Sequence, residues 1–227
     1  MGYKLKLLNL IELLELDDIN LTSYASPLKI VTIGKILNFN SDTHVIDFGC
    51  GRGDALTLWG KYFNISGLGV EVHKSHCESA EQKIKNNNLQ NKISIKCTDA
   101  SQYKFEKNKY DIASCLGASM IWGGFKLTLQ KLKQAIKDEG AIIIGEPYFT
   151  NNSVPRGLIE LEGECHTESE ILNIIRSEGF QLKFVKRASR DEKDRYRANF
   201  SGELQEKAIK YMKDYYYGWS IYVIKRQ

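Results

Sequence analysis

Three alternating glycines follow an apolar segment and precede a helical one, in the stretch Val-Ile-Asp-Phe-Gly-Cys-Gly-Arg-Gly-Asp at residues 45–54. Because glycine has no Cβ, such a loop lets backbone amides approach a ligand closely. The loop departs from the dinucleotide fingerprint G-x-G-x-x-G, since Asp54 stands where the third glycine belongs. A carboxylate near the start of a helix is poorly placed beside a pyrophosphate. We therefore expect a nucleoside ligand that lacks one.

Two later carboxylates fit the two halves of a nucleoside. Glu71 stands at the expected end of the second strand and can accept hydrogen bonds from two ribose hydroxyls. Asp99 follows the third strand and can accept from the exocyclic amine of an adenine, while Ala100 and apolar neighbours enclose the ring. Asp47 should lie beneath the glycine loop, fixing its amides or meeting an amino group of the ligand. The pattern predicts an adenosine with a short zwitterionic tail, although each carboxylate taken singly is also typical of a solvated strand end.

A second set of candidates lies at the carboxyl ends of the fourth and fifth strands, the edge where open α/β sheets bind ligands. Glu146 precedes Pro147, which ends the strand and holds Glu146 extended. We expect its carboxylate to project into the crevice as a general base or as an anchor for a cationic acceptor; a helix cap or a solvated glutamate is the alternative. The weaker candidates could equally pack in the core or in a lid: Tyr148 for catalysis, and Trp122, Arg195, Tyr196 and Trp219 for substrate contact.

The elements that must position these residues alternate between short β-branched runs and helical stretches, a pattern typical of a doubly wound α/β fold with a mostly parallel sheet. Strands are expected at residues 45–46, 68–72, 93–95, 110–114, 141–145 and 180–185, and a seventh at 219–223 whose direction the spacing leaves open. One helix should stop at the turn 138–140, where Gly140 marks its exit. Another should begin with a capping box of Thr167 and Glu170 and end at a left-handed Gly179.

These motifs together resemble those of the class I S-adenosylmethionine-dependent methyltransferases. The resemblance rests on D-F-G-C-G-R-G-D, Glu71, Asp99 and Ser114-Cys115-Leu116-Gly117. More narrowly, further segments look like an uncharacterised bacterial subfamily of small-molecule type: Ser26-Pro27, Gly117-Ala118 before Gly123-Gly124-Phe125, Gly145-Glu146-Pro147-Tyr148, Asp194-Arg195-Tyr196 and Gly218-Trp219.

The resemblance implies a Rossmann-like sheet of seven strands with the last one antiparallel, a helical cover over the substrate pocket, and S-adenosyl-L-methionine as the cofactor. It implies methyl transfer to a small molecule of unknown identity. The expected cofactor-binding residues are Asp47, Gly49, Cys50, Gly51, Gly53, Glu71, Val72, Asp99, Ala100, Cys115 and Leu116.

The composition is that of one globular domain spanning residues 1–227, with 42% hydrophobic and 26% charged residues and a net charge of +4. We expect a helical N-terminal cover at 1–40, a cofactor-binding core at 41–146, and the remaining sheet and substrate cover at 147–227. The leucine-rich start at 5–16 is interrupted by polar residues, so it is predicted to be an amphipathic helix, with no membrane association. Five cysteines without paired spacing indicate reduced thiols in a cytoplasmic protein. A monomer or homodimer is expected.

Two other functions stay open. Residues 183–197 hold seven Lys and Arg, which could form a phosphate-binding face of a nucleic-acid methyltransferase. Asp191, Glu192 and Asp194 interrupt that face, and the fourth strand lacks the [D/N]-P-P-[Y/F/W] tetrapeptide used on base amines, so a nucleic-acid partner is disfavoured. A non-catalytic S-adenosylmethionine-binding module is the other alternative. No metal is predicted, because Cys165-His166 with nearby glutamates has no known ligand spacing.

Overall fold

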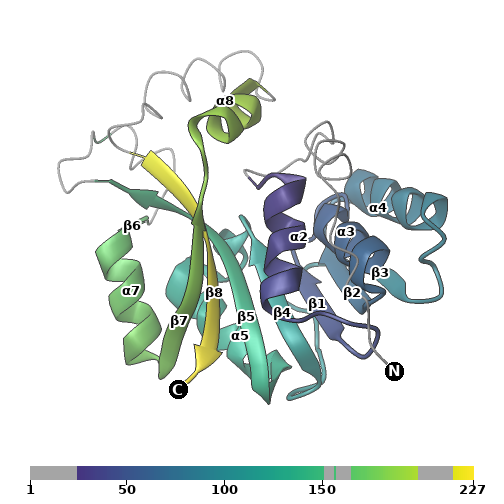
Figure 1. The fold of residues 1–227 in the computed structure, drawn as a ribbon, viewed down its shortest axis with the longest axis horizontal. Helices are drawn as coiled ribbons and strands as arrows, with labels where there is room; N and C mark the ends of the chain where they lie inside the picture. Colours follow the sequence, from purple (N-terminus) through teal and green to yellow (C-terminus); the bar gives the residue numbers. More distant parts are fainter. Residues whose placement is uncertain (1–24, 151–155, 157–164, 199–216) are drawn as a thin grey trace.

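The computed structural model describes residues 25–150, 156, 165–198 and 217–227 of the chain. Within these ranges, the elements form two groups along the chain, α2 to β5 and β6 to β8 (Figure 1). In the first group helices and strands alternate, except that β4 follows β3 with no helix between them. The first group contains α2 (Pro27–Ile36), β1 (His44–Phe48), α3 (Asp54–Phe63), β2 (Ser66–Glu71), α4 (Lys74–Asn86), β3 (Ile93–Cys97), β4 (Tyr110–Leu116), the 3₁₀ helix η1 (Ser119–Trp122), α5 (Phe125–Ala135) and β5 (Ile136–Phe149). The second contains β6 (His166–Thr167), α7 (Glu168–Ser177), β7 (Phe180–Arg187), α8 (Arg190–Ala198) and β8 (Tyr217–Arg226).

All the described strands belong to one sheet, with the order β3-β2-β1-β4-β5-β8-β7 and the short β6 paired beside the end of β5. The pairs from β3 to β5 are parallel, whereas β8 runs antiparallel to both β5 and β7. The predicted doubly wound, mostly parallel sheet with an antiparallel last strand is therefore confirmed. The chain adds β2 and β3 on one side of β1 and then β4 and β5 on the other side. In open α/β sheets, such a change of direction leaves a crevice at the carboxyl ends of the strands.

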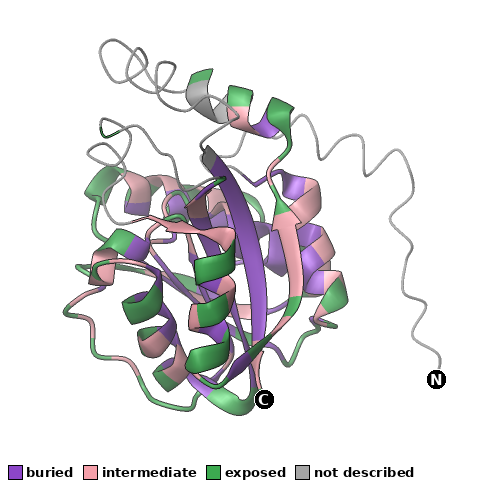
Figure 2. Ribbon diagram, turned by 90° about the vertical axis from the view of Figure 1, so that its left-hand side faces the viewer, coloured by how far each residue is buried: buried purple, intermediate pink, exposed green. Residues whose placement is uncertain are grey.

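The core has two layers, one on each face of the sheet. On one face α2 and α3 cover residues such as Val45 and Ile143, and on the other face α5 and α7 cover residues such as Ile46 and Ile144. Successive residues of these strands thus face opposite layers and are both buried, which explains their continuous β-branched runs. Figure 2 shows the strands largely buried and the helices exposing their outer surfaces.

Local signals set several helix ends as expected. The Thr167 side chain accepts from the Glu170 amide, and the Glu170 carboxylate accepts from the Thr167 amide, so the predicted capping box begins α7. Gly179 follows this helix with φ at +81°, the left-handed conformation that was predicted. Ser26 caps α2, where Pro27 occupies the first turn.

The turn predicted at residues 138–140 is wrong. Helix α5 ends at Ala135, and β5 starts at the next residue, so Gly140 lies inside a strand. The pairing of β4 with β5 shifts register between Tyr110 and Ile112, which accommodates the extra residues. The predicted amphipathic helix at 5–16 lies outside the described residues. No described helix is long and apolar enough to span a bilayer.

Candidate cofactor and acceptor site

The glycine loop joins β1 to α3 in a conformation that only glycine adopts readily. Gly49, Gly51 and Gly53 have φ angles of +66°, +55° and +70°. A Cβ at Gly49 would also lie 2.5 Å from Ala118 Cβ, inside van der Waals contact. The Gly49 amide donates to the Val70 carbonyl at 2.8 Å, which fixes the loop over the end of β2. The loop therefore needs glycine both for its backbone angles and for its packing.

Glu71 lies at the carboxyl end of β2 and is only 5% exposed. Its Oε2 accepts from the Gly51 amide at 2.9 Å, and its Oε1 accepts from the amides of Val72 and His73 at 3.0 and 2.9 Å. His76 Nδ1 lies 3.9 Å from Oε1. A carboxylate offers about four acceptor positions. Three are used here, so Glu71 both orders the glycine loop and keeps acceptor capacity for a ligand hydroxyl.

Asp47 lies beneath the loop, as expected, and is 2% exposed. Burial raises the pKa of Asp47 to about 7, the Ser114 hydroxyl that donates to Oδ1 at 2.7 Å lowers the pKa, and the nearby charge of Glu71 raises it. Burial, together with the Asp47 and Glu71 charges, also raises the pKa of the Cys50 thiol. Cys50 is thus a neutral wall residue, and Asp47 changes its charge near neutral pH.

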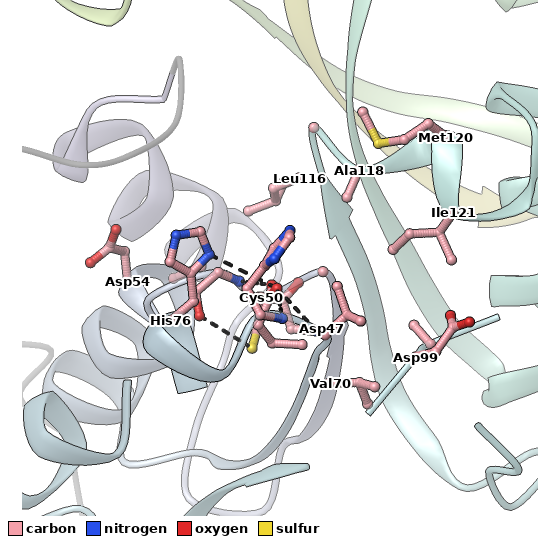
Figure 3. Close-up of a pocket in the computed structure, with 18 of the residues that line it drawn as sticks. Asp47, Cys50, Asp54, Val70, His76, Asp99, Leu116, Ala118, Met120 and Ile121 are labelled. Carbon is pink, nitrogen blue, oxygen red and sulfur yellow. Dashed lines mark hydrogen bonds and ion pairs between the residues drawn. The ribbon is translucent and has the colours of Figure 1, made fainter. Parts of the chain in front are cut away.

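A pocket of about 370 Å³ opens above these residues at the carboxyl ends of β1, β2 and β4 (Figure 3). Its volume lies within the usual range for small-molecule sites, roughly 300 to 1,000 Å³. Asp99 lies at its rim, with Oδ1 accepting from the Ser101 amide at 2.8 Å. The predicted cofactor residues that line the pocket are Asp47, Gly49, Cys50, Gly51, Glu71, Val72, Asp99, Ala100 and Leu116.

Two predicted cofactor residues do not line this pocket. Gly53 is buried against Ala80 at the start of α3, so it shapes the loop from below. The Cys115 side chain is fully buried in the core beneath α5. Cys115 precedes Leu116, the last residue of β4. Successive side chains of a strand point to opposite faces, so the Cys115 side chain points away from the pocket that Leu116 lines.

Glu146 is 3% exposed and does not line the pocket above the glycine loop, so the alternative of a solvated glutamate is wrong. Its predicted role at the acceptor end of the sheet stays a prediction. The carboxylate accepts from the Ser119 hydroxyl at 2.9 Å. Ser119 begins η1, whose next two residues, Met120 and Ile121, do line the pocket. Glu146 therefore lies directly behind one wall of the pocket.

The aromatic candidates pack mainly against the sheet. Trp219 is 2% exposed, and its ring lies over Gly145, where a Cβ would be 2.4 Å away. The Tyr148 ring crosses Gly218 on the neighbouring strand in the same manner. Trp122 packs edge-on against Phe48, with 5.2 Å between ring centroids. These side chains shape the acceptor end of the sheet through packing.

Arg195 and Tyr196 belong to α8, and their side chains lie outside the described part of the chain. Helix α8 is fixed to α2 by Glu192, which accepts from the Ser26 amide at 3.0 Å and forms an ion pair with Lys29. Burial raises the pKa of Glu192, but the hydrogen bonds from Lys29, Ser189 and Ser26 and the charge of Lys29 outweigh it, so the pKa is lowered overall. Ile30 of α2 lines the pocket, so α8 is attached to a helix that contributes to the pocket wall.

The sequence of residues 45–140 matches a family model described as a methyltransferase domain. This segment runs from β1 to the start of β5 and includes the glycine loop, Glu71 and Asp99. The match makes this segment similar to a methyltransferase domain, and it covers less than half of the 227-residue chain.

Solved structures share the fold of this chain over most of its length. A S-adenosylmethionine-dependent methyltransferase from Thiobacillus denitrificans, in complex with S-adenosyl-L-homocysteine, is similar with a TM-score of 0.79 and 23% identity, over 92% of this chain and 95% of that one. The YjhP structure from E. coli has a TM-score of 0.82 and 21% identity, over 93% and 97%. A geranyl diphosphate C-methyltransferase from Streptomyces coelicolor A3(2) has a TM-score of 0.73 and 12% identity, over 89% and 78%.

In sequence, the chain is 31% identical over 121 residues to the uncharacterized protein YjhP of Escherichia coli strain K12. The aligned part is 53% of this chain and 48% of YjhP, so the match spans about half the length of that relative.

The sheet also has buried polar residues that sequence reasoning missed. Ser220 and Tyr222 of β8 pair with Glu146 and Ile144 of β5 and therefore share a face of the sheet with Glu146. Both are fully buried, and burial raises the pKa of Tyr222. Ser220 interrupts an apolar run in the sequence, which was the one available signal. The His73 and His76 contacts with Glu71 were missed as well.

The cysteine prediction is partly wrong. Cys77 of α4 and Cys97 of β3 form a disulfide, whereas Cys50, Cys115 and Cys165 are free thiols. The pairing depends on α4 folding back over β3, which residue spacing alone does not reveal. Among the described residues, no group of three His, Cys, Asp or Glu side chains could hold a metal ion.

Proposed function

We propose that this chain is a class I methyltransferase, which binds S-adenosyl-L-methionine in the pocket above the glycine loop and transfers its methyl group to a small-molecule acceptor. The observation that carries the proposal is that Glu71 and Asp99 line one pocket together with Gly49, Cys50 and Gly51 of the glycine loop. Complexes with S-adenosyl-L-homocysteine in proteins of the same fold support this choice of ligand.

The residues of the pocket fit the parts of that cofactor. Glu71 would accept from a ribose hydroxyl and Asp99 from the adenine amine. Val72 and Met120 are 57% and 73% exposed although both are apolar, and both line the pocket. Covering a flat purine would remove their surface from water, which stabilises the complex. Asp47, once ionised, lies where a negative charge can balance the amino group of the cofactor's tail.

The bound cofactor supplies an electrophilic methyl group on its sulfonium, so the chain has to orient the acceptor and exclude water. Alignment of reacting groups can contribute roughly 7 to 11 kcal/mol, whereas a general base adds about 10²- to 10⁴-fold in rate. We propose that Glu146 acts behind the η1 wall, with Tyr148 beside it, as the proton acceptor or the anchor for a cationic substrate. Its hydrogen bond with Ser119 would hold the carboxylate toward the methyl group.

A small acceptor is favoured over a nucleic acid by the ion pairs of the basic segment. Arg187 donates to both oxygens of Glu168, at 3.0 and 2.8 Å, and is therefore committed within the chain. Glu192, an acidic residue within this segment, forms an ion pair with Lys29 of α2. The geranyl diphosphate enzyme shows that the fold admits a small acceptor in another protein. A cytoplasmic location and a monomeric or homodimeric state remain part of the proposal.

The test is a turnover assay with labelled cofactor and fractionated small-molecule extracts. We expect S-adenosyl-L-homocysteine to be released only when an extract fraction is present, and the label to appear in a small product. Tight cofactor binding without product from any fraction would favour a non-catalytic binding module. RNA binding that collapses between 50 and 200 mM salt, with label in the RNA, would replace the small molecule by a nucleic acid.

A further inference from the structure

The disulfide between Cys77 and Cys97 joins the first turns of α4 to the end of β3. The two Cα atoms are 5.8 Å apart, and the residues are separated by 20 positions in sequence. Cys77 is 3% exposed, whereas Cys97 is exposed. One sulfur of the bridge therefore belongs to a residue at the surface and the other to a residue in the interior.

The bridge lies directly behind the carboxylate that is proposed to bind ribose. Cys97 is the register partner of Glu71 on the neighbouring strand. Cys77 Sγ lies 3.4 Å from the Glu71 carbonyl oxygen, which also accepts from the Thr98 amide at 2.8 Å. Asp99, which also lines the pocket, follows Cys97 by two residues. The covalent link thus contacts the backbone of Glu71 and lies two residues before Asp99.

Helix α4 packs on the sheet independently of the bridge. Ala80 and Ile84 are 0% and 3% exposed, and Leu89 and Ile93 continue this apolar contact beyond the helix. The fold therefore has other interactions that hold α4 in place. What the bridge adds is a fixed distance between the segment 71–76 and the segment 97–100, which form two walls of the pocket.

We propose that Cys77 and Cys97 are a reversible thiol–disulfide modification site that sets the affinity of the pocket for its cofactor. The inference rests on the proposed function, since it needs the cofactor to bind between Glu71 and Asp99. The oxidised form presents both carboxylates in fixed positions, and a site that is ordered before binding binds more tightly. Reduction leaves only noncovalent contacts, the β2–β3 pairing and the packing of α4, to hold the two walls, so their spacing fluctuates more and binding weakens.

The chemistry follows from the difference in exposure. A thiolate of a dithiol reductant attacks Sγ of the exposed Cys97, the bond to Cys77 breaks, and Cys77 leaves as a thiolate that takes up a proton. The second thiol of the reductant then displaces Cys97 from the mixed disulfide. The protein gains two electrons and the dithiol is oxidised to a disulfide; a small-molecule disulfide such as oxidised glutathione reverses the reaction. In the reduced form, the Cys77 thiol is placed to donate to the Glu71 carbonyl.

The test is calorimetric titration of S-adenosyl-L-homocysteine into the full chain, oxidised with glutathione disulfide or reduced with dithiothreitol. Alkylation under denaturing conditions and mass spectrometry count the thiols in each sample. We expect the three free cysteines to react in the oxidised protein and all five in the reduced one. The dissociation constant should rise roughly three- to tenfold on reduction.

Two variants control the measurement. Cys97→Ser, at an exposed position, should bind like the reduced protein and lose its response to dithiothreitol, whereas Cys165→Ser should keep the full response. Cys77→Ala, read in the same way, serves if Cys97→Ser folds poorly. Equal affinities of the oxidised and reduced protein, or five reactive thiols under both conditions, would overturn the switch alone. Absence of binding in both states would overturn the proposed function and this site with it.

Discussion

The cofactor side and the acceptor side of the sheet are built from contacts of different range. On the cofactor side, the pocket residues come from the glycine loop and from the ends of β2 and β3, which are consecutive parallel strands. On the acceptor side, Glu146 of β5 meets Ser119 of η1, and its strand neighbour is Ser220 near the end of the chain. The cofactor side therefore depends on local backbone conformation, and the acceptor side depends on long-range pairing. Substitutions should affect the two sides in different ways.

The largest effect is expected at Gly49. Gly49→Ala places an alanine at a left-handed φ and a Cβ at 2.5 Å from the Ala118 Cβ. The free energy of unfolding should therefore fall by roughly 2 to 5 kcal/mol, and cofactor binding should be abolished. Urea unfolding and calorimetry measure the two effects. Gly179→Ala is the matched control, because its φ is +81° but nothing lies within 4 Å of the new Cβ. It should cost only about 1 to 2 kcal/mol and leave binding unchanged; equal effects of both changes would show that packing at Ala118 is unimportant.

Substitutions on the acceptor side should lower turnover and leave cofactor affinity unchanged. Glu146→Gln keeps the shape of the side chain and removes its charge, so cofactor affinity should be unchanged while turnover falls about 10²-fold. Release of S-adenosyl-L-homocysteine with an active extract fraction measures turnover, and calorimetry measures affinity. Ser119→Ala should lower turnover by a smaller factor, because it removes only the hydrogen bond that holds the carboxylate. Full turnover in Glu146→Gln would remove Glu146 from the acceptor proposal.

A third expectation concerns Asp47 and pH. Its folded pKa is about 7 and its ordinary value is 3.8, so the folded protein binds the proton more tightly than the unfolded chain. Stability from this carboxyl is therefore present at low pH and is lost as the pH rises from about 4 to 7. Between pH 5 and 7, wild type should lose about 2 to 3 kcal/mol relative to Asp47→Asn, as measured by urea unfolding. Parallel stability profiles of the two proteins would contradict the raised pKa.

The smallest effect is expected at Glu71. Glu71→Ala removes the acceptor of three backbone amides and of the proposed ribose hydroxyl, so cofactor binding should weaken by roughly 1 to 3 kcal/mol. Glu81→Ala, an exposed glutamate on α4, is the control for a change of net charge and should bind like wild type. Unchanged calorimetric affinity of Glu71→Ala would remove the ribose assignment.

The same difference in range explains what could be predicted from the sequence. The glycine loop, the position of Glu71 and the capping box at Thr167 depend on a few neighbouring residues, so their patterns were sufficient. The burial of Glu146 was not predictable, because it depends on η1 folding back over β5. The same holds for the disulfide, which requires α4 to lie over β3, and for Gly140, which lies in the irregular part of strand β5 instead of ending a helix.

The pocket between Glu71 and Asp99 is tested most directly by a crystal structure of the chain grown with S-adenosyl-L-homocysteine. We expect the ribose to contact Glu71, the adenine to lie between Val72 and Met120 with its amine toward Asp99, and the sulfur to face the η1 wall in front of Glu146. Adenosine bound anywhere else on the protein, or a diphosphate ligand lying across Asp54 at the start of α3, would contradict the assignment.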